Sequence, residues 1–320
     1  MARAVDVPSL VEGARDGQVR ALARLLSLVE DARPELRAVM AALAPHTGSA
    51  LIVGLTGAPG VGKSTTTSAL VTAFRKREQR VAVLAVDPSS PFSGGALLGD
   101  RIRMQEHATD PGVYIRSMAT RGHLGGLSWA APQALRVLDA AGFDVVLVET
   151  VGVGQSEVEV ASLADSTLVL LAPGMGDGIQ AAKAGILEIA DIFVVNKADR
   201  DGADATVRDL RHMVSLGERP QPGDWRPPVI KTVAATGTGI GEVLEAIDAH
   251  HAWARGNGHL QARRRKRAEE EIEAIAVTAL RDQLASVRDG QRLADLAADV
   301  VEGTVDPYAA ADRLLAEIRT

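Results

Sequence analysis

The chain has 320 residues, of which 46% are hydrophobic, 24% are charged and only 3% are aromatic, and its formal net charge is −6. Scarce aromatic residues argue against a stacking surface for single-stranded nucleic acid, and the negative charge argues against a general polyanion binder. Because the chain contains no cysteine, disulfides, thiolate metal sites and cysteine nucleophiles are excluded.

The first 18 residues lack an apolar run of signal-peptide length, and the longest apolar runs elsewhere have the length of strands. We therefore expect a cytoplasmic protein without a membrane partner. Residues 9–43 are predicted to be helical, with Pro34 in the first turn of a second helix. Apolar residues recur there at helical spacing, namely Val19, Leu22, Leu25, Leu26 and Val29. Residues 1–48 would form an N-terminal helical extension.

From residue 50, short apolar runs rich in β-branched residues alternate with helical stretches. Continuous apolar strands are typical of a sheet that helices cover on both faces. Their alternation with helices predicts an α/β fold with a doubly wound, mostly parallel sheet. The first two runs and the helix between them predict a right-handed βαβ unit, unlike Ras-type GTPases, which place an antiparallel strand next. The predicted strands lie at 50–57, 80–87, 112–118, 143–150, 166–174, 192–199 and 228–235.

The Pro- and Gly-rich segment 217–228 is predicted to be a surface loop of this domain, which we place at residues 49–252. Strand signals then stop, and residues 253–320 are predicted to form a C-terminal helical arm. Its apolar stripe runs from Ile272 to Leu284, and Asp306-Pro307 would cap and open the last helix. Because glutamates at 269–271 follow the basic run 263–267, we interpret that run as a solvated helix rather than a nucleic-acid site.

Residues 57–64, GAPGVGKS, match the phosphate-binding pattern G-x-x-x-x-G-K-[ST]. Glycines let the backbone curl so that N–H groups face the phosphates, and the following helix adds positive potential. We expect Lys63 to reach the β- and γ-phosphates and Ser64 to ligate Mg²⁺. A dinucleotide-binding loop, with Asp87 on the ribose, is the competing interpretation, but G-x-G-x-x-G is absent. The predicted phosphate-binding residues are Gly57, Ala58, Gly60, Val61, Gly62, Lys63, Ser64 and Thr65.

Asn196-Lys197-Ala198-Asp199 follows an apolar run and matches the guanine-specificity motif N-K-x-D. A carboxylate at Asp199 can accept from guanine N1–H and the exocyclic amine, whereas adenine presents neither donor in that arrangement. We therefore predict that Asn196, Lys197 and Asp199 bind GTP or GDP, and that the backbone near Ala235 meets guanine O6.

Glu149 ends a predicted strand where nucleotide hydrolases usually carry an aspartate for Mg²⁺. A longer carboxylate can still bind the metal directly or through water. Gly152 would donate its N–H to the γ-phosphate, and Gln155 is a candidate for orienting water. Asp87 and Asp100 are further candidates for the metal, the alternative being that both are caps or solvated turn residues.

Together these residues resemble the MeaB/ArgK family, the methylmalonyl-CoA mutase-associated GTPases of the SIMIBI class of P-loop proteins. The resemblance covers nearly the whole chain. The stretches that carry it most specifically are 54–65, 86–104, 116–128, 149–160 and 196–199.

The resemblance implies a homodimeric GTPase, joined through its C-terminal helices, that protects an adenosylcobalamin-dependent acyl-CoA mutase and gates its cofactor loading. It also implies that Asp87, Asp100 and Glu149 form a magnesium and switch network. Segment 173–183 would be an additional switch, in which Asp177, Gln180 and the catalytic candidate Lys183 sense the nucleotide or the partner.

Intrinsic hydrolysis should be slow, because no arginine stands in an identifiable finger position, and a partner would accelerate it by ordering switch loops. Two other functions remain open at this point. One is a P-loop kinase or ATPase acting in small-molecule metabolism or transport. The other is a nickel- or zinc-insertion GTPase, against which the lack of cysteine and of histidine clusters weighs.

Overall fold

A computed structural model describes residues 5–87, 104–119, 130–150, 156–174, 188–216, 223–288 and 291–318. The chain divides into two compact units, residues 1–263 and residues 264–320. The boundaries expected at residues 48 and 252 stay predictions.

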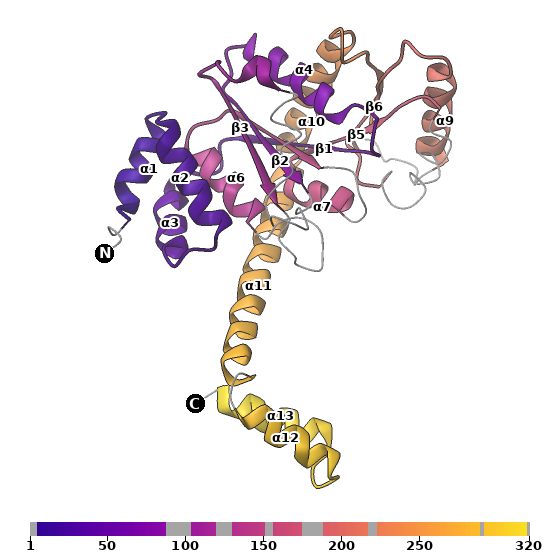
Figure 1. Ribbon diagram of the computed structural model, residues 1–320. Helices are drawn as coiled ribbons and strands as arrows, with labels where there is room; N and C mark the ends of the chain where they lie inside the picture. Colours follow the sequence, from indigo (N-terminus) through magenta and orange to yellow (C-terminus); the bar gives the residue numbers. More distant parts are fainter. Residues whose placement is uncertain are drawn as a thin grey trace. The chain divides into compact units, whose positions relative to one another are not determined.

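Unit 1 is built on a single sheet of seven parallel strands in the order β3-β2-β4-β1-β5-β6-β7 (Figure 1). Each strand falls on one of the predicted runs, although β3 extends one residue beyond its run, so the predicted α/β fold with a parallel sheet is confirmed. The strands are β1 (Leu51–Thr56), β2 (Val81–Asp87), β3 (Val113–Ala119), β4 (Val145–Thr150), β5 (Ser166–Leu171), β6 (Ile192–Val195) and β7 (Val229–Lys231).

Helices cover both faces of this sheet (Figure 1). Helices α4 (Lys63–Arg75) and α10 (Ile240–Gly256) pack on one face, and α6 (Ala131–Ala140), α7 (Ser156–Leu163) and α9 (Ala203–Leu216) pack on the other. Alternate strand residues point to opposite faces. Leu147 belongs to the core beneath α4, so Glu149, two residues further along β4, also points toward α4.

Three N-terminal helices extend the core on the side of α6: α1 (Val7–Arg15), α2 (Val19–Glu30) and α3 (Leu36–Leu43), followed by the 3₁₀ turn Ala44–His46. Helices α2 and α3 pack against α6, and α1 packs against α2 and α3. The predicted stripe is buried at Leu22, Leu25, Leu26 and Val29. The predicted stripe does not hold at Val19, which is the first residue of α2 and is 63% exposed. Pro34 lies just before α3 rather than inside it.

Helix α11 (His259–Arg288) crosses the boundary between the units, and α12 (Gln291–Val301) packs against α13 (Pro307–Ile318) in unit 2. The predicted cap of α13 is confirmed, since Asp306 Oδ1 accepts from the N–H groups of Tyr308 at 2.9 Å and Ala309 at 3.1 Å. Among the described residues, no helix has the length and apolar character needed to cross a membrane.

Candidate functional site

The phosphate loop joins β1 to α4 through backbone that only glycine can adopt. Gly57 has φ +142° and Gly62 has φ +97°, both in the region that side chains disfavour. A Cβ on Gly57 would lie 2.3 Å from the carbonyl oxygen of Leu170, and a Cβ on Gly62 would lie 2.4 Å from Asn196 Nδ2. The glycines therefore let the loop approach both β5 and the guanine motif.

Lys63 is the first residue of α4, and its side chain turns back into the loop. Its ammonium donates to the carbonyl oxygens of Gly57 at 2.6 Å and Ala58 at 3.2 Å, and the residue is only 7% exposed. No side chain caps α4, whose N-terminus concentrates backbone N–H donors and positive potential at the same place. Loop, lysine and helix end together form a cradle for an anion.

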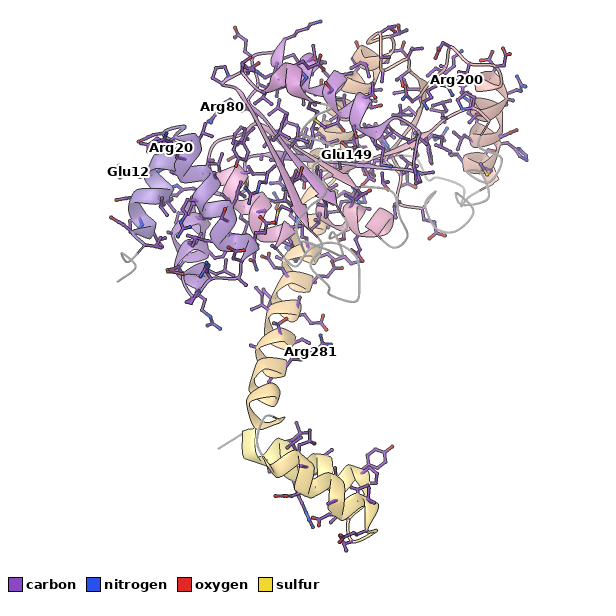
Figure 2. The ribbon with its side chains drawn as sticks, in the orientation of Figure 1. Glu12, Arg20, Arg80, Glu149, Arg200 and Arg281 are labelled. Atoms are coloured by element: carbon purple, nitrogen blue, oxygen red, sulfur yellow. The ribbon has the colours of Figure 1, made fainter. Side chains whose placement is uncertain are left out.

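Glu149 lies on β4, where Figure 2 labels it. Its side chain points toward α4, and the residue is 4% exposed. Its two carboxylate oxygens accept from different hydroxyls of α4. Ser64 Oγ donates to Oε1 at 2.6 Å, and Thr67 Oγ1 donates to Oε2 at 2.7 Å. The structure therefore brings the two predicted metal residues, Ser64 and Glu149, together.

This donor set suits Mg²⁺, because it consists of oxygen atoms alone and Mg²⁺ prefers such ligands while retaining several waters. No group of three or more His, Asp or Glu side chains in the described ranges could hold a metal. Among the described residues, Ser64 and Glu149 are therefore the two predicted metal residues whose side chains lie together.

Asn196 ties the guanine motif to the phosphate loop. It directly follows β6, is 3% exposed, and its Nδ2 donates to Val61 O at 2.9 Å. Its Oδ1 accepts from Ala234 N at 3.0 Å and from Thr232 Oγ1 at 3.2 Å. One buried amide thus links the phosphate loop, the N-K-x-D motif and the loop after β7.

The remaining guanine-motif residues leave their base-reading groups open. Lys197 has φ +57° and its ammonium donates to Gly60 O at 2.6 Å. Asp199 is exposed, and within the described ranges its carboxylate has no hydrogen bond or ion pair. Ala235 is also exposed, and its N–H donates to no described residue. An acceptor and a donor are therefore free for a base.

The structure leaves several predicted residues undescribed. Asp87 is the last residue of β2, but its side chain lies outside the described part. The residues that lie wholly outside it are Asp100, Gly152, Gln155, Asp177, Gln180 and Lys183. Those it does bring to one site are Gly57, Ala58, Gly60, Val61, Gly62, Lys63, Ser64, Thr65, Glu149, Asn196, Lys197, Asp199 and Ala235.

Sequence reasoning missed Thr67 and a second polar cluster. Thr67 follows Ser64 by three residues on a predicted helix, so helical spacing could have placed both hydroxyls on one face. The second cluster contains Asp191, which binds the Arg263 guanidinium through two 2.7 Å hydrogen bonds. Interpreting run 263–267 as solvated is therefore wrong for Arg263. It fits Lys266, which pairs along the helix with Glu270 at 3.9 Å.

A phosphate loop and an N-K-x-D motif, bonded to each other where parallel strands end, define a P-loop GTPase. Residues 22–289 match the family model described as methylmalonyl Co-A mutase-associated GTPase MeaB, and the chain belongs to this family. A putative GTPase of Pyrococcus abyssi is 48% identical over 314 residues, covering 98% of this chain and 97% of the relative.

Two further comparisons bear on function. The mitochondrial methylmalonic aciduria type A homologue of Mus musculus is 37% identical over 274 residues, covering 81% of this chain and 66% of the relative. A crystal structure of an LAO/AO transport system kinase superposes with a TM-score of 0.71 at 28% identity, covering 100% of both chains.

Proposed function

We propose that this GTPase is a chaperone of an adenosylcobalamin-dependent acyl-CoA mutase, gating the loading of its cofactor and protecting it. The observation that carries the proposal is the family match over residues 22–289, and the relative named for methylmalonic aciduria supports it. The same proposal includes a cytoplasmic location and excludes nucleic-acid and membrane partners.

The site supports binding and hydrolysis of GTP by positioning and charge. Lys63 would exchange its two carbonyl partners for β- and γ-phosphate oxygens, which are charged and therefore stronger acceptors. Ser64 and Glu149 would hold Mg²⁺, which neutralises charge on the transferred phosphoryl group when bound. Gly57, Gly62 and the start of α4 shape the cradle. We assign Asp87, Asp100, Gly152 and Lys183 supporting roles by resemblance alone.

We expect Asp199→Asn to shift nucleotide preference from GTP toward xanthosine triphosphate. The asparagine amide would face guanine donors with a donor of its own, whereas xanthine presents an oxygen there. Because a mismatched buried polar pair is costly, GTP affinity should fall by about 100-fold or more. Competitive titration of GTP, ATP and xanthosine triphosphate measures the change.

Asp204→Asn is the matched control, since Asp204 is also an exposed acid near the motif but pairs with Lys231 at 3.0 Å. It should leave the preference for GTP intact. If Asp199→Asn binds GTP as tightly as the wild type, the Asp199 carboxylate does not recognise the guanine base.

Partner binding should accelerate hydrolysis, because ordered switch loops supply groups that the free protein lacks. Methylmalonyl-CoA mutase and a related isobutyryl-type mutase should each be added to the GTPase, with an unrelated enzyme as the control. The correct client should raise the hydrolysis rate by more than about twofold. If neither mutase does so, the chaperone proposal should be dropped.

The proposed homodimer rests on unit 2. Among its described residues, only Leu296 and Ala310 are buried apolar side chains, whereas Ile272, Leu280, Val301 and Tyr308 are more than half exposed. A helical unit with so little core of its own is suited to packing against a second copy.

A small-molecule kinase is the second candidate, and the similarity to the LAO/AO transport system kinase favours it. The open carboxylate of Asp199 argues against it, because that group selects guanine rather than adenine. Phosphorylation of an acceptor with ATP as the preferred donor would support the kinase instead.

A further inference from the structure

Glu149 is held by two hydroxyls rather than one. Ser64 Oγ donates to Oε1 at 2.6 Å and Thr67 Oγ1 donates to Oε2 at 2.7 Å. Thr67 is fully buried, and Ser64 is 9% exposed. Both hydroxyls come from α4, three residues apart, so one face of one helix presents both donors about 4.5 Å apart along its axis.

The length of the glutamate side chain explains why a second hydrogen bond to its carboxylate matters. Glutamate has one more rotatable bond than the aspartate usual at this strand end, so holding its carboxylate in one orientation costs more side-chain entropy. A hydrogen bond to Oε1 restrains only one of the two carboxylate oxygens. A second contact to Oε2 fixes both oxygens at once.

These contacts are compatible with a bound cation. An ionised carboxylate only accepts hydrogen bonds, so both hydroxyls must donate to it. A hydroxyl that donates its proton keeps its lone pairs, so Ser64 Oγ can face Mg²⁺ while still holding Glu149. Thr67 Oγ1 also lies 3.0 Å from Lys63 O, one turn back on the helix, and this contact places the hydroxyl rotamer beneath Glu149.

We propose that Thr67 is a positioning residue for magnesium binding, and that it fixes Glu149 in the orientation that the longer carboxylate would not keep by itself. The inference rests on the proposed role of Glu149 toward Mg²⁺. Thr67 touches neither the metal nor the nucleotide in this assignment and acts through Glu149 alone.

Thr67→Val removes the hydroxyl and keeps the shape of the side chain. The test follows dissociation of a fluorescent GDP analogue across a magnesium titration, alongside GTP hydrolysis. A hydrogen bond to a charged group is strong, so the variant should need about tenfold more Mg²⁺ to retain the nucleotide. Thr67→Ser should restore the requirement to within about threefold of the wild type.

Thr66→Val is the matched control. Thr66 is also fully buried on α4, and its hydroxyl lies 3.0 Å from the carbonyl oxygen four residues back, Gly62 O, as that of Thr67 lies 3.0 Å from Lys63 O, but it makes no hydrogen bond to Glu149. It should therefore change the Mg²⁺ requirement by less than about twofold. Far-ultraviolet circular dichroism confirms folding, and Thr67→Ala serves as a second variant if the valine is not accommodated.

Glu149→Gln separates this inference from the proposed site. If Glu149→Gln raises the Mg²⁺ requirement but folded Thr67→Val or Thr67→Ala does not, the role of Thr67 is refuted and the site stands. If all of these variants retain nucleotide at wild-type Mg²⁺ concentrations, the metal role of Glu149 is refuted and the inference falls with it.

Discussion

Lys63→Met should slow GTP hydrolysis by about 10³-fold, because one preorganised charged donor at the transferred phosphoryl group contributes on that scale. Methionine keeps the aliphatic stem of the lysine and removes only the charge. In the structure the ammonium is held by Gly57 O and Ala58 O, so the variant removes a group already placed in the cradle. The loop glycines and Asn196, which shape the cradle, are untouched.

Single-turnover hydrolysis at saturating GTP measures this effect, and thermal unfolding of the nucleotide-free protein shows whether the fold is retained. Lys76→Met is the matched control, since Lys76 is exposed at the far end of α4, about 20 Å away by helical rise. It should hydrolyse GTP like the wild type. A Lys63→Met rate within about tenfold of the wild type would contradict the assignment.

The strands could be predicted from the sequence because each is a continuous run of β-branched and apolar residues, buried on both faces. Their order in the sheet could not be read in the same way. Nothing in the run at 145–150 says that it inserts between β1 and β2, because this depends on how the connecting helices pack. Val19 shows the same limit at a helix end, where periodicity holds but no neighbour covers the residue.

The candidate site also contains features that the sequence predicts and features that only the structure shows. The positions of Lys63, Ser64 and Asp199 could be predicted because each belongs to a motif of fixed spacing. The bridge from Asn196 to Val61 O, 135 residues away in sequence, depends on the fold bringing two strand ends together. The partner of Glu149 at Thr67 lies 82 residues away. Local patterns identified Asn196 and Glu149, and only the structure identified the groups to which they are bonded.

Asp191 is the clearest example of a buried contact network that the sequence alone does not predict. It stands at the start of β6, 8% exposed at its side chain, and accepts from Thr167 N at 2.8 Å. His250 Nε2 lies 3.2 Å from its Oδ1, and the other ring nitrogen lies 2.7 Å from Ser166 Oγ. Trp225 Nε1 donates to its carbonyl oxygen at 2.7 Å. With Arg263, these contacts tie β5, β6, α10 and α11 together.

Asp191→Asn should destabilise the protein by about 3 kcal/mol at neutral pH, because removing one partner of a buried ion pair typically costs about 3–5 kcal/mol. We take the low end because the Arg263 side chain is 42% exposed and water can partly replace its lost partner. Denaturant unfolding, followed by the fluorescence of Trp225 and Trp253 beside His250, measures the loss. Asp248→Asn is the matched control, because Asp248 pairs with Arg77 at the surface and both side chains are about half exposed. It should lower the free energy of unfolding by about 0–1 kcal/mol.

The destabilisation caused by Asp191→Asn should also depend on pH, and it should become smaller in acid. Burial raises the pKa of Asp191, but hydrogen bonds from His250 and Arg263 outweigh it and hold the pKa below its ordinary value. The ionised carboxylate therefore stabilises the native state fully above the unfolded pKa of about 3.9, and this stabilisation is lost as the pH falls through the lower, folded pKa. Asparagine does not titrate, so the difference in unfolding free energy between wild type and Asp191→Asn should shrink below about pH 4. A difference that stays constant into acid would show that the carboxylate charge contributes nothing there and that the variant acts through packing alone.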